Sequence, residues 1–157
     1  ISLCPSSIGW HAAGTINDLN WDTAFCEIFE RCAKLHRAGD TRAEKWFTDA
    51  EKAFLTSIGY TTQEFFDFVD DHCRYGNEGP TLETSLLIAA VRRDYFKVIM
   101  GGKFTGKTIP PSELPPKPLA VDGIPWLPRL IVKARANLRG EMDPDTMYGC
   151  GGDCGFF

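Results

Sequence analysis

Apolar residues recur at helical spacing through most of this 157-residue chain. The first such stretch begins near Asn17, where Asn17 or Asp18 can cap a helix, and ends at Gly39, which suits a left-handed terminus. Its apolar positions lie three or four residues apart and therefore share one helical face: Trp21, Phe25, Ile28, Phe29, Cys32 and Leu35. No stretch alternates long enough to indicate a strand, so we predict an all-α fold.

Two capping boxes mark the next helix starts. In "TDAE" the Thr48 oxygen can accept a backbone N–H while Glu51 reaches back, and "TTQE" repeats this pattern at Thr61 and Glu64. Gly59 ends the first of these helices, and the second is predicted to run to about residue 73.

A longer helix is predicted from Thr81 to about Ile99, after a loop of composition "RYGNEGP". Its inward residues are predicted from their spacing: Leu82, Leu86, Ala89, Ala90 and Phe96.

Residues 101–123 hold five of the ten prolines. "IPPSELPPKP" cannot form a helix or a central strand, because proline lacks the N–H and clashes with the preceding turn, so we predict an extended connector. Helical spacing resumes in "PWLPRLIVKARANLRG" and ends at Gly140. The residues predicted to face inward there are Trp126, Leu130, Ile131, Ala134 and Leu138.

The two halves of the chain echo each other. "FERCAKLHRAG" and "IVKARANLRG" both place a basic, glycine-terminated helix before a polar loop and an aromatic pair. We therefore predict a bundle of about five or six helices built from a tandem or permuted unit. The expected parts are an irregular arm at 1–16, helical unit one at 17–100, the connector at 101–123, and the start of an incomplete second unit at 124–157.

"WLPRLIVKARANLRG" followed by "YGCGGDCGFF" resembles the bacterial domain-of-unknown-function family numbered 5069, whose members typically read L-P-R-L-x-D-K-A-R-A-x-L-x-G and then Y-x-C-P-L-D-x-x-F. The family's aspartate before lysine is Val132 here, and its Pro-Leu is Gly151-Gly152. The shared positions run from 127 to 156: Leu127, Pro128, Arg129, Leu130, Lys133, Ala134, Arg135, Ala136, Leu138, Gly140, Tyr148, Cys150, Asp153 and Phe156.

The next segment of that family, a Phe-Leu-x-x-x-Gly-Ile helical stretch, looks like "AFLTSIGYTTQEFFDFV", which comes earlier in this chain. The resemblance is good over 125–157 and loose over 18–95. It implies a mainly helical fold and brings no established activity.

The bulk composition excludes some classes of function. The formal net charge of −4 disfavours nonspecific binding to nucleic acid, and no apolar run approaches the roughly 20 residues that a membrane helix needs. No signal-peptide pattern is visible, so we favour a cytoplasmic location.

The chain contains six cysteines. Cys26 and Cys32 lie within one helical pattern, and we expect both to be buried free thiols. Cys150 and Cys154 flank Asp153 in "YGCGGDC", where a helix start would favour a thiolate. This turn is interpreted as a structural turn, as a disulfide or redox pair, or as half of a site for a divalent metal such as zinc. The remaining metal ligands would have to come from His11, His36, His72, Cys4 or Cys73.

Two further groups of residues are candidate sites. His72 and Cys73 follow two aspartates in "DDHC" and can be metal ligands or an acid–base group, or His72 can simply complement a helix C-terminus. Arg129 and Lys133 are four residues apart and share a helix face. With Tyr148 they can clamp a carboxylate or a phosphate, or they can be surface cations paired with acids.

"GGKFTGKT" at 101–108 matches the spacing of a phosphate-binding loop. Such a loop follows a buried strand and opens a helix, whereas this one is predicted to follow a helix and precede prolines, so nucleotide binding is disfavoured.

No complete catalytic set is visible. We therefore expect a noncatalytic helical binding or assembly module that engages a protein partner or a second copy of itself. The alternative is a metal- or thiol-dependent protein with its site at the CGGDC turn.

Overall fold

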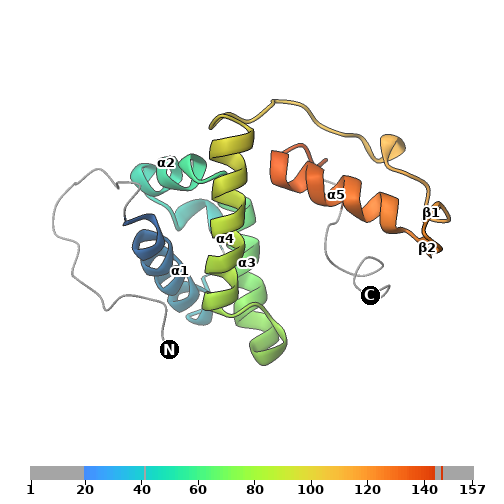
Figure 1. Cartoon of the computed structure of the whole chain (residues 1–157). Helices are drawn as coiled ribbons and strands as arrows, with labels where there is room; N and C mark the ends of the chain where they lie inside the picture. Colours follow the sequence, from blue (N-terminus) through green and yellow to red (C-terminus); the bar gives the residue numbers. More distant parts are fainter. Residues whose placement is uncertain (1–19, 41, 144–145, 147–157) are drawn as a thin grey trace. The chain divides into compact units, whose positions relative to one another are not determined.

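The computed structural model describes residues 20–40, 42–143 and 146 (Figure 1). The described residues are mainly helical, which confirms the predicted all-α class. The chain divides into two compact units, residues 1–94 and 95–157, and each is described separately below. No helix of the described residues is long and apolar enough to cross a membrane.

The described residues of unit 1 form four α-helices. They are α1 (Trp21–Arg37), α2 (Asp49–Ser57), α3 (Thr62–Tyr75) and α4 (Leu82–Asp94). Short 3-10 turns at Ala43–Lys45 and Gly76–Glu78 lie in the connections. Helix α1 packs against both α3 and α4, so α1 has a central place in this unit.

Aromatic side chains fill the core of unit 1. The Phe25 ring lies 5.2 Å from the Phe65 ring in an edge-to-face contact, and Phe29 and Tyr60 also pack on Phe65. Trp46 and Phe47, from the loop after α1, are buried against the same cluster. Such pairs add specific geometry to the burial of apolar area, and they explain why α1 and α3 are fixed face to face.

Both predicted capping boxes are confirmed. Thr48 and Thr61 each accept a hydrogen bond from the backbone N–H three residues later, and the glutamates at those positions accept from the backbone N–H of the threonines. Gly39 and Gly59 follow α1 and α2 with φ of +88° and +81°, as predicted for left-handed helix ends.

The cysteine expectation is correct for Cys32 and wrong for Cys26. Cys32 is a fully buried free thiol in the core. Cys26, also buried on α1, is disulfide-bonded. Helical spacing places both cysteines on the inner face but carries no information about bonding to a distant cysteine.

Unit 2 begins with a π-helical turn at Tyr95–Ile99, followed by the proline-rich stretch with a 3-10 turn at Pro111–Glu113. A two-stranded antiparallel hairpin then joins β1 (Ala120–Val121) to β2 (Ile124–Pro125), and it leads into α5 (Leu127–Arg139). Figure 1 shows the extended connector running from the end of α4 to this hairpin.

The hairpin corrects the prediction of a wholly extended connector. Asp122 and Gly123 have φ of +51° and +79°, the positive values that a two-residue hairpin turn needs. The prediction that Ile131 faces inward is also wrong, since its side chain is exposed. Gly140 ends α5 as predicted, with φ of +65°.

Candidate functional sites

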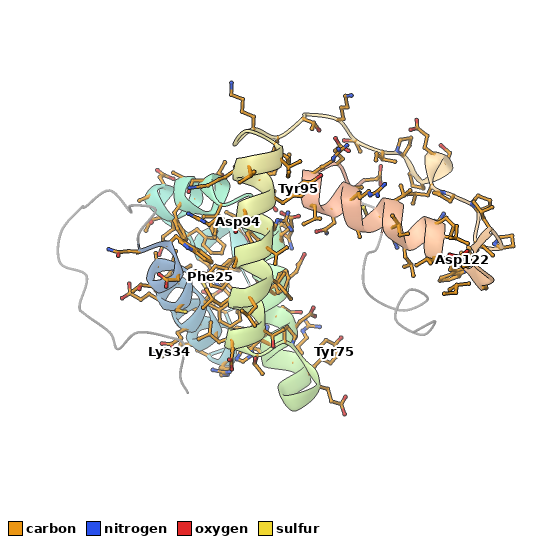
Figure 2. The ribbon with its side chains drawn as sticks, viewed as in Figure 1. Phe25, Lys34, Tyr75, Asp94, Tyr95 and Asp122 are labelled. Atoms are coloured by element: carbon orange, nitrogen blue, oxygen red, sulfur yellow. The ribbon has the colours of Figure 1, made fainter. Side chains whose placement is uncertain are left out.

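A pocket of about 290 Å³ lies beside His72 in unit 1. Helix α1 provides most of its wall, because positions 29, 30, 33, 34 and 37 share one helical face. His72 from α3 and Leu82 from α4 complete it. Lys34 is labelled on α1 in Figure 2. The lining combines an apolar floor with charged groups at the rim: Phe29, Glu30, Ala33, Lys34, Arg37, His72 and Leu82.

Hydrogen bonds define the state of the His72 ring. Nδ1 lies 2.8 Å from the carbonyl oxygen of Pro80, and Nε2 lies 3.1 Å from a terminal nitrogen of Arg37. A carbonyl only accepts and a guanidinium only donates, so Nδ1 carries the proton and Nε2 is the acceptor. His72 is therefore neutral in this arrangement, and it orients Arg37 at the pocket.

Cys73 does not join His72 in a nucleophilic pair. The Cys73 thiol points to the carbonyl oxygen of Ala33 at 3.8 Å, while both nitrogens of His72 have other partners. Burial raises the pKa of the Cys73 thiol above its usual range. A thiol that stays protonated is a weak nucleophile and a weak metal ligand.

A second histidine lies close by in an ionic cluster. Nε2 of His36 is 2.7 Å from Oδ1 of Asp70, and the same oxygen accepts a 2.8 Å hydrogen bond from Nε of Arg74. Asp70 thus joins the last turn of α1 to α3. The two aspartates before His72 therefore differ in role from each other, since Asp70 is a structural ion-pair partner and Asp71 is exposed.

The structure describes only part of the predicted metal or thiol site. Tyr148, Cys150, Asp153 and Cys154 lie outside the described residues, as do Cys4 and His11. Among the described residues, no group of three His, Cys, Asp or Glu side chains is placed to hold a metal ion. The metal or thiol site at the CGGDC turn stays a prediction.

The predicted anion clamp on α5 is also only partly described. Arg129 donates a 3.0 Å hydrogen bond to the carbonyl oxygen of Pro115, which ties the connector to the first turn of the helix. The Lys133 side chain is buried, with 4% of its surface exposed. Arg129 therefore has a structural contact that sequence reasoning missed, since the pairing spans fourteen residues.

The glycine-rich segment at 101–108 has no helix directly after it among these described residues. Its glycines at 101, 102 and 106 have positive φ, and Ile109 pairs with Met142 in an isolated bridge. A 3-10 turn of three residues follows at Pro111–Glu113. Without the N-terminus of an α-helix, this segment does not form a phosphate-binding loop.

Helix α4 presents apolar side chains on two opposite sides. Leu86 and Ala89 are buried in the core of unit 1. Leu87, Ile88 and Val91 point outward, with 57%, 42% and 67% of their surface exposed. We call these three residues the outer face of α4. The run "SLLIAAV" contains both sets, but its composition alone does not reveal which members are covered.

Comparison with known proteins gives no relative for this chain. No family model matches it, and neither a curated protein nor a solved structure does.

Proposed function

We propose that this protein is a noncatalytic helical assembly module that pairs with a second copy of itself through the outer face of α4. The observation that carries the proposal is the exposure of three neighbouring aliphatic side chains, Leu87, Ile88 and Val91. They lie at positions i, i+1 and i+4, so they form one continuous surface on the helix.

A helix that is apolar all round is normally covered all round. The middle of α4 fits this description, because Leu86 and Ala89 are buried on the side opposite the outer face. An uncharged aliphatic surface is self-complementary, and a two-fold interface brings the same patch of both copies together. A second copy is therefore the simplest partner for this face.

The expected affinity of the two copies for each other is modest. Burying the exposed part of each of these side chains is worth roughly 1 kcal/mol, so the three from each copy contribute about 6 kcal/mol together. Association costs about 4–15 kcal/mol in lost freedom. The three side chains alone offset only the lower end of this cost, so further contacts along α4 must contribute to the interface, and we expect a weak, reversible dimer that dissociates on dilution.

Several features agree with a noncatalytic role. His72 and Cys73 each use their polar atoms in separate contacts. Membership of the family numbered 5069 remains part of the proposal, and it brings a helical fold without an activity. The metal or thiol alternative concerns the CGGDC turn, where Cys150→Ser with Cys154→Ser should abolish bound metal or redox activity and leave self-association intact.

The test is sedimentation velocity over a concentration series with wild-type protein and a Leu87→Glu/Val91→Glu double variant. The wild type should shift with concentration toward twice its mass of 17.5 kDa. The double variant should stay at the monomer mass, because two carboxylates per copy would have to be desolvated in the interface.

The matched control is Leu119→Glu/Val121→Glu, which places the same two charges at other exposed aliphatic residues, in and beside the hairpin of unit 2. It should associate as the wild type does. Wild-type protein that remains monomeric at every concentration would contradict the proposal. A double variant that associates normally would also contradict it.

A further inference from the structure

We propose that the pocket beside His72 is a binding site for a small organic monocarboxylate. The charged and apolar residues of its lining fit a ligand that has a carboxylate and an apolar part. Arg37 and Lys34 face the position of the carboxylate, and Phe29, Ala33 and Leu82 face the position of a short chain or ring.

The charges at the rim favour an anion. Lys34, Arg37 and Glu30 line the pocket, and His72 is neutral in its observed hydrogen bonds, so one positive charge is in excess. Lys34 and Glu30 have no ion-pair partner within the described part of the chain. Basic residues in the last turn of α1 complement the helix dipole, but the dipole does not explain the pocket in front of them.

Arg37 has N–H donors with which it can bind a carboxylate. A guanidinium has five N–H donors, and within the described residues Arg37 uses one terminal nitrogen, on Nε2 of His72. The remaining donors are free to form the paired hydrogen bonds that a carboxylate accepts from arginine. The hydrogen bond that Nδ1 of His72 donates to the carbonyl oxygen of Pro80 fixes the ring, so the ring holds Arg37 in one orientation before the ligand arrives.

The apolar floor and the size define the ligand class. Phe29 and Ala33 are almost fully buried beneath the pocket, and the Phe29 ring also makes an edge-to-face contact with His72 at 5.2 Å. The volume of about 290 Å³ is at the lower end of the range for small-molecule sites. A ligand the size of benzoate is therefore favoured over a nucleotide or a long acyl chain.

The experiment is a titration of the full chain with benzoate, followed by ¹H–¹⁵N correlation spectra. Benzyl alcohol and inorganic phosphate serve as probes of the ring alone and of charge alone. Benzoate should give saturable shifts at Ala33, Arg37, His72 and Leu82, with a dissociation constant on the order of 1 mM, ordinary for so small a ligand. Benzyl alcohol and phosphate should bind at least about tenfold more weakly.

Substitutions of the exposed residues at the rim of the pocket test binding without disturbing the folded core. Arg37→Gln and Lys34→Gln should weaken benzoate binding, the former by about tenfold. Glu30→Gln should strengthen binding, because it removes the one negative charge from the rim. The matched control, Arg42→Gln, changes an exposed arginine outside the pocket and should have no effect.

Four results would overturn the proposal. The first three are the absence of saturable shifts at the pocket residues, equal binding by Arg37→Gln and Arg42→Gln, and weaker binding by Glu30→Gln. Phosphate that binds as tightly as benzoate would also overturn it, since the apolar floor would then contribute nothing.

Discussion

The guanidinium of Arg92 donates a 2.6 Å hydrogen bond to Oε1 of Glu64, joining α4 to the first turn of α3. Arg92 is buried, with 3% of its surface exposed, and its Nε also donates to the carbonyl oxygen of Gly59. The other carboxylate oxygen of Glu64 accepts from Thr61 in the capping box. Glu64 thus takes part in capping the N-terminus of α3 and also pairs with the buried guanidinium of Arg92.

Arg92→Met should therefore destabilise the protein strongly. The change leaves Glu64 and the carbonyl oxygen of Gly59 without this donor, and we expect a loss of about 2–4 kcal/mol in the free energy of unfolding. Urea unfolding measures this loss. The matched control is Arg74→Met, which breaks an exposed i,i+4 pair with Asp70 and should cost less than about 1 kcal/mol. Equal losses for the two variants would contradict this assignment.

The two capping threonines should differ in importance. Thr48→Ala removes a cap whose glutamate, Glu51, also pairs with the half-buried Arg31. We expect a loss of about 1 kcal/mol in the free energy of unfolding. Thr61→Ala should cost more, because it also loosens Glu64 where that residue holds the buried Arg92. Thermal unfolding compares the stability of the two variants. A larger loss of stability in Thr48→Ala would show that the two caps act independently of Arg92.

Gly140 should resist substitution more than Gly106 does. Both have positive φ, so alanine costs about 1 kcal/mol at either position. At Gly140 an added Cβ would also meet the Phe104 ring at 2.8 Å, whereas nothing lies within 4 Å at Gly106. Urea unfolding should show a larger loss in the free energy of unfolding for Gly140→Ala than for Gly106→Ala. Equal losses would mean that Phe104 moves aside at no cost.

Asp40 should contribute weakly to the acid sensitivity of the protein, because its ion pair with Arg42 is exposed to solvent. Hydrogen bonds from Arg42 lower the pKa of the Asp40 carboxyl to about 2. A lowered pKa means that the folded state favours the ionised form, so this contribution to stability is complete above the unfolded value of about 3.9 and is lost as pH falls toward 2. A ¹³C titration of the carboxyl measures the pKa, and Arg42→Ala should raise it toward the ordinary value. An unchanged pKa in that variant would assign the shift to another group.

The two described free thiols should react slowly in the folded protein. Burial raises the pKa of Cys32 to about 12 and raises that of Cys73 as well. The thiolate is the reactive species, so iodoacetamide at pH 8 should label both residues much more slowly than in urea. Peptide mass spectrometry reads each site separately. Rapid labelling of Cys73 in the native state would restore it as a candidate reactive thiol.

Local patterns predicted the helices of unit 1 well. The capping boxes at Thr48 and Thr61 and the glycines after α1 and α2 act through contacts within a few residues, so the sequence carries them directly. The hairpin was missed although Asp122-Gly123 between apolar residues is a hairpin signal. Each strand has only two residues, which is too short for an alternating pattern to be visible.

The candidate sites depend on long-range contacts and were predicted less completely. His72 was singled out from "DDHC", but its partner Arg37 lies 35 residues away, so periodicity alone could not pair them. Arg92 lies 28 residues from Glu64, and its position within the helical pattern gave no sign of burial. The outer face of α4 was recognisable as an apolar run, whereas its exposure depends on how α1 covers the opposite side.

The most direct test of the self-association proposal is an isotope-filtered NOE experiment on a mixed sample of labelled and unlabelled protein. The proposal predicts intermolecular NOEs among the methyl groups of Leu87, Ile88 and Val91, and the loss of those from Ile88 in the Leu87→Glu/Val91→Glu variant. Methyl groups that show only intramolecular contacts at concentrations where the mass has doubled would place the interface elsewhere and contradict the proposal.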